Sequence, residues 1–103
     1  MAEMTGRLDS VLATLRAHES DLRRFGVAHA AVVGSVARRE DRADSDVDVL
    51  VELDRERPMG IFEYARLNLY IGELWDGASD VVNRRTLKPQ LRDNILRDAV
   101  NVF

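Results

Sequence analysis

Apolar side chains recur at helical spacing near the start of the chain, which predicts an amphipathic helix over Thr5–Phe25. Gly26 follows, where a left-handed residue would close the last helical turn. The apolar run His29–Val33 then predicts a short buried strand that ends at Gly34. The helical stripe consists of Leu8, Val11, Leu12, Leu15, Leu22 and Phe25.

A second strand is predicted over Asp46–Glu52, which reads Asp, Val, Asp, Val, Leu, Val, Glu. Successive side chains of a strand point to opposite faces, so Asp46 and Asp48 share one face and the valines at 47, 49 and 51 share the other. The polar segment Gly34–Ser45 between the two strands is expected to be a loop with one turn of helix at most.

The segment Gly60–Trp75 is expected to be a helix that is apolar around most of its circumference, preceded by a charged turn over Asp54–Pro58. A helix this apolar in so small a domain should contact something beyond its own core. Phe62 is assigned to the core, whereas Trp75 fits either the core or a partner surface.

The last quarter of the chain predicts a third strand over Ser79–Asn83 and a final helix. Thr86 is expected to cap this helix and Pro89 to lie in its first turn, where proline is tolerated. Asn101–Phe103 could add a short terminal strand. The predicted fold is α/β (α+β): a small mixed sheet with helices packed mainly on one face and polar chemistry on the other.

Composition limits the function classes. A chain of 103 residues forms one domain, residues 1–103, with no room for a second substrate-binding domain. It contains no cysteine, which excludes disulfides and thiolate chemistry and fits a cytoplasmic protein. No apolar run is long enough to span a membrane. The net charge of −3 argues against direct nucleic-acid binding.

Asp46 and Asp48 are the strongest candidates for metal ligands. Two carboxylates on one strand face, roughly 7 Å apart, repel each other unless a cation lies between them. Mg²⁺ favours one or two carboxylates together with substrate phosphate oxygens. Asp80, on the next strand, could supply a third carboxylate and complete a site for two ions.

Gly34 and Ser35 are candidates for phosphate binding. A glycine at a strand end lets the backbone approach a phosphate closely, and the serine offers both its N–H and its hydroxyl. Arg38, Arg39 and Lys88 are cations that could balance the remaining phosphate charge. Each motif alone has a structural alternative: a common turn for Gly-Ser, a solvated face for Asp-x-Asp and a surface position for Asp80.

The order and spacing of these motifs carry a family resemblance. Gly34-Ser35-Val36-Ala37-Arg38-Arg39-Glu40, followed by Asp44-Ser45-Asp46-Val47-Asp48-Val49-Leu50-Val51-Glu52, resembles the signature of the polymerase-beta-like nucleotidyltransferases, and the minimal nucleotidyltransferase (MNT) domains among them. The likeness extends from about His29 to Asn101.

The resemblance implies roles for five of these residues. Metal would bind to Asp46, Asp48 and Asp80, and the Gly34-Ser35 turn would hold a triphosphate. The sequence departs from the pattern at Arg39, where the family usually has glycine. If this position needs a positive φ, arginine strains the loop.

The resemblance also implies a function: Mg²⁺-dependent transfer of AMP from ATP to a hydroxyl of a partner protein. Many stand-alone MNT domains resemble the antitoxin of a pair whose toxin is a HEPN ribonuclease. Two alternatives stay open. One is an inert antitoxin that acts by steric binding, and the other is transfer to a small molecule such as an aminoglycoside. The three carboxylates disfavour the inert protein, because a purely steric protein has no need to bring three carboxylates together, and the absence of an acceptor domain disfavours the small molecule.

Overall fold

The computed structural model describes residues 6–42, 44–57, 59–75 and 78–103, and contains one four-stranded mixed sheet. The strands are β1 (Val27–Val33), β2 (Val47–Leu53), β3 (Ser79–Asn83) and β4 (Val100–Asn101). Their order across the sheet is β3-β2-β1-β4. β1 runs antiparallel to β2 and β4, whereas β2 and β3 are parallel.

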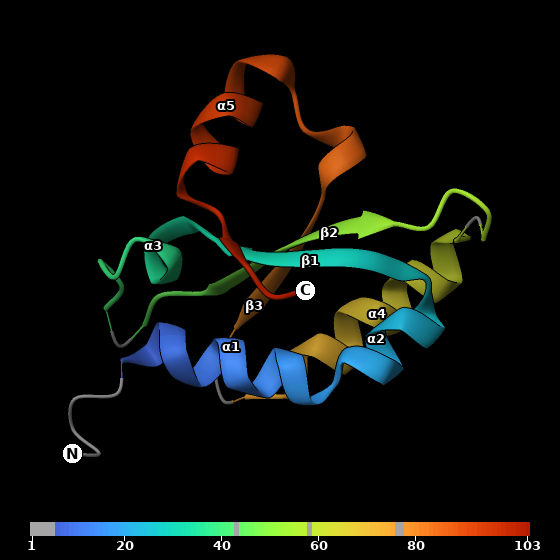
Figure 1. The fold of residues 1–103 in the computed structure, drawn as a ribbon, viewed down its shortest axis with the longest axis horizontal. Coiled ribbons are helices and arrows are strands. Elements are labelled where there is room, and N and C mark those ends of the chain that lie inside the picture. The colour runs from blue at the N-terminus through green and yellow to red at the C-terminus, as the bar shows by residue number, and fades with distance from the viewer. Residues whose placement is uncertain (1–5, 43, 58, 76–77) are drawn as a thin grey trace.

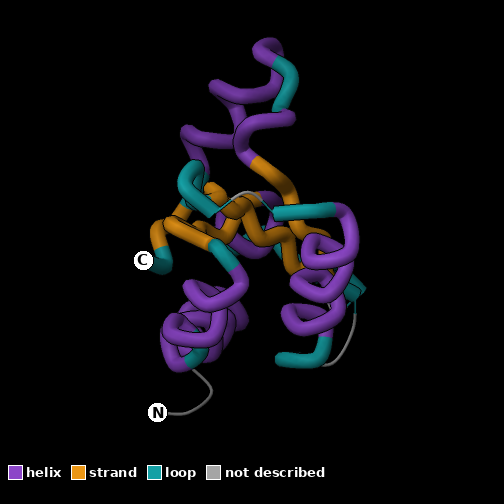
Figure 2. Tube along the Cα trace, turned by 90° about the vertical axis from the view of Figure 1, so that its right-hand side faces the viewer, coloured by secondary structure: helices purple, strands orange, loops and turns teal. Residues whose placement is uncertain are grey.

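Most helices cover one face of this sheet, as predicted. In Figure 1, α1 (Arg7–Ala17), α2 (Glu19–Phe25) and α4 (Ile61–Gly72) lie below the sheet, and α5 (Pro89–Asp98) stands above it. Figure 2 shows the same layers from the side. The short α3 (Gly34–Ala37) follows β1 directly, and the 3₁₀ turn η2 (Arg84–Thr86) leads from β3 towards α5.

The predicted alternation of the second strand is confirmed in β2. Val47, Val49 and Val51 are fully buried in the core with Leu15, Leu22, Leu67 and Ile71 from the helices below. Asp48 projects from the opposite face, which the larger helical layer does not cover. The same strand therefore supplies the core with one set of side chains and the second face with the other.

The first predicted helix is wrong in one respect, because it is two helices. At His18 the backbone leaves helical geometry, with φ −108° and ψ 18°, and a ring nitrogen of His18 lies 2.8 Å from the carbonyl oxygen of Thr14 in a hydrogen bond. α2 then starts at Glu19 and buries Leu22. Gly26 ends α2 with a φ of 105°, so the predicted left-handed stop is confirmed.

Thr86 does not cap the last helix. Its hydroxyl donates to the carbonyl oxygen of Asn83, at 3.0 Å, inside η2. α5 instead begins at Pro89, with Lys88 in the preceding position at φ −66° and ψ 139°. A residue before proline is driven out of helical geometry, which explains why the helix cannot start earlier. Pro89 itself lies in the first turn, as predicted.

Two aromatic side chains of the segment predicted as the Gly60–Trp75 helix differ in burial. Phe62 is 80% exposed, so its assignment to the core is wrong. Trp75 follows the helix, is half-buried and packs against the core. The predicted turn over 54–58 and the start of the first predicted helix each include residues outside the described parts of the chain, namely Pro58 and Thr5.

Candidate functional site

The three candidate carboxylates lie at one end of β2 and β3. Asp48 pairs with Asp80 across the parallel β2–β3 ladder and with Val33 across the antiparallel β1–β2 ladder. Because neighbours in register share a face, the Asp48 and Asp80 side chains project from the same side of the sheet. Asp46 directly precedes β2 and is exposed, as is Asp80, whereas Asp48 is half-buried.

Gly34 meets this group of carboxylates at the end of β1. Its φ is 76°, a left-handed conformation that glycine adopts without strain. A Cβ atom at this position would collide with a carboxylate oxygen of Asp48. The backbone of residues 34–35 can therefore approach the carboxylate only because residue 34 has no side chain, which gives a physical reason for glycine here.

The pKa of Asp48 reflects the electrostatics of the site. Partial burial raises the pKa of this carboxyl above its ordinary value of 3.8, and the negative charges of Asp80 and then Asp46 raise it further. Arg38 opposes these effects only in part. The ionised group thus sits in a negative potential that a cation would relieve.

Arg38 lies beside the site, close to acidic side chains. Its Nε donates to Glu40 at 3.1 Å, and its guanidinium lies 3.9 Å from the carboxylate of Asp98 at the end of α5. The predicted phosphate contact would require Arg38 to exchange one of these partners for a ligand. Lys88 is exposed next to the start of α5.

The φ of Arg39 is 58°, so the position where the family usually has glycine does require a positive φ. Its guanidinium donates to both carboxylate oxygens of Asp9 on α1, at 3.2 and 3.4 Å. This contact lowers the pKa of Asp9, through the hydrogen bond first and the charge second. Arg39 therefore ties the loop after α3 to the first helix, a contact that sequence reasoning missed because the partners are 30 residues apart.

The residues present fit a divalent ion. All three candidate ligands are carboxylates, the hard oxygen donors that Mg²⁺ prefers. In the part of the chain that the structure describes, no three side chains of His, Cys, Asp or Glu are grouped closely enough to hold a metal ion by themselves. Mg²⁺ usually takes one or two carboxylates and completes its shell with substrate phosphates and water, so the pair Asp46 and Asp48 is a sufficient protein contribution.

Tyr64 of α4 supports the strand that carries Asp80. Its hydroxyl donates to the carbonyl oxygen of Val81, at 3.1 Å. Burial raises the pKa of Tyr64, and the negative charge of Asp80 raises it further, so the phenol remains a neutral donor at neutral pH.

The outer side of α4 carries a set of exposed apolar side chains. Ile61 and Phe62 are each 80% exposed and Leu69 is 68% exposed. The predicted excess of apolar residues on this helix is confirmed, and exposed apolar surface of this kind is typical of protein contacts. No helix within the described ranges is both long and apolar enough to cross a membrane.

Comparison with known proteins agrees with this geometry. The family model of the nucleotidyltransferase domain matches residues 15–102. The protein adenylyltransferase MntA of Thermococcus cleftensis is 37% identical over 103 residues, which cover 99% of this chain and 100% of that protein.

Solved structures show the same fold. A candidate minimal nucleotidyltransferase superposes with a TM-score of 0.77 and 38% identity, covering 90% of this chain and 93% of that one. A toxin–antitoxin crystal structure with AMP-PNP gives a TM-score of 0.69 at 15% identity, over 87% of this chain and 72% of that one, and shows the fold alone.

Proposed function

Because this chain belongs to the nucleotidyltransferase family, we propose that it transfers AMP from ATP to a hydroxyl group of a partner protein. The observation that carries the proposal is the pairing of Asp48 with Asp80 next to Gly34, in a chain that matches a protein adenylyltransferase along its whole length. The partner would be the toxin of a toxin–antitoxin pair, of the HEPN ribonuclease type. A fold neighbour from a toxin–antitoxin crystal structure supports a toxin as the partner.

Each candidate residue has a task in this reaction. Asp46 and Asp48 would hold two Mg²⁺ ions, with Asp80 as a further ligand. The backbone and hydroxyl of Ser35, next to Gly34, would donate to the triphosphate, and Arg38 would balance its charge after leaving Asp98. Arg39 is nearby as a second cation, held by Asp9. Mg²⁺, when bound, neutralises phosphate charge and favours attack on the α-phosphorus.

The exposed side chains Ile61, Phe62 and Leu69 support a protein partner. A small-molecule acceptor would gain nothing from an apolar helix face on the opposite side of the sheet from the carboxylates. An inert antitoxin would use the same helix face, so a binding assay alone does not separate it from the enzyme.

The test is to co-express the chain with the product of the adjacent gene and to measure binding and modification separately. We expect a hetero-complex by size exclusion, and added AMP masses on the partner when MgATP is present. Asp46→Asn with Asp48→Asn should abolish the mass shift and the Mg²⁺ dependence of ATP binding in calorimetry, while the complex persists. A partner that is bound and silenced without ever gaining mass would instead establish the steric antitoxin.

A further inference from the structure

A strongly basic pocket of about 270 Å³ lies at the carboxyl ends of β2 and β3. Four arginines line this arginine pocket together with one leucine and a single carboxylate: Arg55, Arg84, Arg85, Arg92, Leu53 and Glu52. The whole chain has a net charge of −3, so this excess of positive charge is local. Like charges held close together repel one another, and an anion in the pocket would relieve that repulsion.

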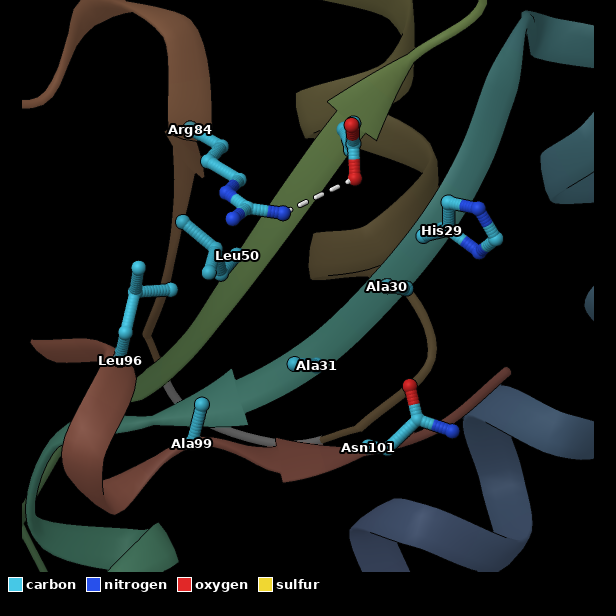
Figure 3. A pocket seen from close by; sticks show the side chains of 9 residues that line it. His29, Ala30, Ala31, Leu50, Arg84, Leu96, Ala99 and Asn101 are labelled. Carbon is cyan, nitrogen blue, oxygen red and sulfur yellow. Dashed lines mark hydrogen bonds and ion pairs between the residues drawn. The ribbon is translucent and has the colours of Figure 1, made fainter.

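The arginine pocket is separate from the carboxylates of the candidate site. Glu52 lies four positions beyond Asp48 on the same face of β2, which is roughly 13 Å at about 3.3 Å per residue. Arg84 directly follows β3, the strand that begins next to Asp80. A cavity of about 370 Å³ beside Leu50 lies between the two groups and shares Glu52 and Arg84 with the arginine pocket (Figure 3).

The four arginines differ in whether they have an acidic partner. Arg84 donates to the carboxylate of Glu52 at 3.2 Å, the contact that the dashed line in Figure 3 marks. Arg55, Arg85 and Arg92 form no ion pair with any residue that the structure describes, and all three are exposed. Glu52 therefore leaves most of the positive charge of the pocket uncompensated.

Three separate segments bring these side chains together. Arg85 belongs to η2, where its backbone N–H donates to Oδ1 of Asn83 at 3.0 Å. Arg92 lies on α5, and Arg55 lies in the turn that follows β2. Because local hydrogen bonds fix the backbone of η2 and α5, a ligand would find most of the pocket already formed.

The shape and the donors of the pocket select the kind of anion. A guanidinium group is a planar fork that pairs with two oxygens of a phosphate or carboxylate at once. A single carboxylate satisfies one such fork, whereas a chain of linked phosphate groups presents oxygens in several directions and can meet three or four forks together. A hollow of this size also favours a compact anion that enters it over the flat surface of a folded protein.

We propose that the arginine pocket binds a chain of linked phosphate groups, and that it does so without Mg²⁺. The chain could be inorganic polyphosphate or the phosphate chain of a second nucleotide, which offer the same chemistry. The inference does not depend on the proposed AMP transfer at Asp48. A bound chain would contact Arg92 on α5 and Arg85 beside the sheet, and so would hold to the sheet a helix that has no buried residue of its own.

The experiment is calorimetry with tripolyphosphate in the presence of EDTA. Without a metal ion the carboxylates at Asp46 and Asp48 repel a polyanion, so they do not contribute to the signal. Arg85→Gln with Arg92→Gln should weaken binding by about tenfold or more, because two charged hydrogen-bonding forks are lost. Both residues are exposed, so the variant should fold, which circular dichroism checks.

Arg66→Gln with Arg97→Gln is the matched control. It removes the same charge from two exposed arginines that do not line the pocket, and it should change the affinity for tripolyphosphate less than about twofold. Asp46→Asn with Asp48→Asn should not weaken this binding either. Equal losses in the pocket variant and the arginine control would overturn the proposal, as would the absence of any tripolyphosphate binding.

Further probes in EDTA identify the source of the phosphate chain. ATP that binds more tightly than tripolyphosphate, with the same dependence on Arg85 and Arg92, would assign the pocket to a second nucleotide. ATP that binds equally or more weakly would assign it to the inorganic chain. Citrate, hexaglutamate or a uridylate hexamer that binds as tightly as tripolyphosphate would overturn the proposal, because the pocket would then serve carboxylates or RNA.

Hydrogen exchange tests the contact with α5. Tripolyphosphate should slow amide exchange along α5 in the wild type and in the arginine control, but not in the Arg85→Gln, Arg92→Gln variant. Binding that leaves the exchange of α5 unchanged in the wild type would overturn a site that includes Arg92.

Discussion

The two faces of the sheet differ in what holds them together. The face towards α1, α2 and α4 is made of side chains with almost no exposure, such as Val47, Val49 and Val51. The face under α5 carries Asp48, Glu52 and Arg84, and α5 itself contributes no fully buried residue. One face therefore supplies stability, and the other carries groups that cost stability until a ligand arrives.

The largest effect is expected for Asp80→Asn on the second face. If Asp80 accepts the acceptor proton, transfer should slow by about 10²–10⁴-fold. Binding of MgATP should change much less, because Asp46 and Asp48 remain. The rate is measured by single-turnover AMP transfer, with calorimetry as the binding control. A transfer rate within threefold of wild type would show that Asp80 is a surface residue with no catalytic role.

The next effect belongs to the core face. Val49→Ala removes two carbons from a side chain with no exposure, in the residue adjacent to Asp48. The free energy of unfolding should fall by about 2 kcal/mol, which combines lost burial with a residual cavity. For a domain of this size the Tm should fall by roughly 10 °C. AMP transfer well below the melting temperature should be retained, and its loss in the folded variant would contradict the division between the faces.

Asp48→Asn should have the opposite effect on stability. The folded chain raises the pKa of Asp48, so the ionised carboxylate costs stability at neutral pH, and the cost disappears as pH falls from the folded pKa towards 3.8. Without Mg²⁺ at pH 7 the variant should be more stable than the wild type, and the gain should be small because water screens the partly exposed carboxylate. Urea denaturation at pH 7, 5 and 3.5 checks this. A gain that does not shrink in acid would assign the effect to another cause.

The smallest effect concerns Arg39, which connects the site loop to the helical layer through Asp9. A positive φ costs energy in any residue except glycine, which favours glycine at this position. The greater flexibility of glycine in the unfolded chain removes part of this advantage. Arg39→Gly should therefore be more stable than Arg39→Ala by about 0.5 kcal/mol, although both lose the ion pair. Paired thermal denaturation of the two variants measures this difference. An alanine variant as stable as the glycine variant would show that the loop relaxes out of this conformation.

Local periodicity predicts the strands of this fold well, because each strand is a short apolar run with a clear boundary. In Asp46–Glu52 a valine occupies positions 47, 49 and 51, and this spacing alone is enough to place Asp48 opposite the core valines. The break at His18 was not predictable, since the apolar stripe continues from Leu15 to Leu22 across it. Phe62 was misassigned for a related reason: its helix offers more apolar side chains than one core can bury.

Contacts between residues far apart in the sequence could not be predicted from local patterns. Arg38 and Asp98 are 60 positions apart and meet only because α5 crosses the second face. The cavity beside Leu50 depends on the same crossing, so its walls have no common motif. The sequence predicted that Asp46 and Asp48 lie two positions apart on one strand and that Asp80 lies on a third strand, whereas the cavity is a product of tertiary packing.

The position of β4 at the sheet edge has a consequence for folding kinetics. Asn101 pairs with Ala31, 70 residues earlier, whereas Asp48 pairs with Val33 across a much shorter loop. Closing the longer loop costs roughly 1.4 kcal/mol more chain entropy by the logarithmic dependence on loop length. The β1–β2 hairpin with its carboxylates can thus form early, and β4 with α5 closes late. Native-state hydrogen exchange should then find the amide of Val102, which donates to the carbonyl oxygen of Ala30, opening before those of β2.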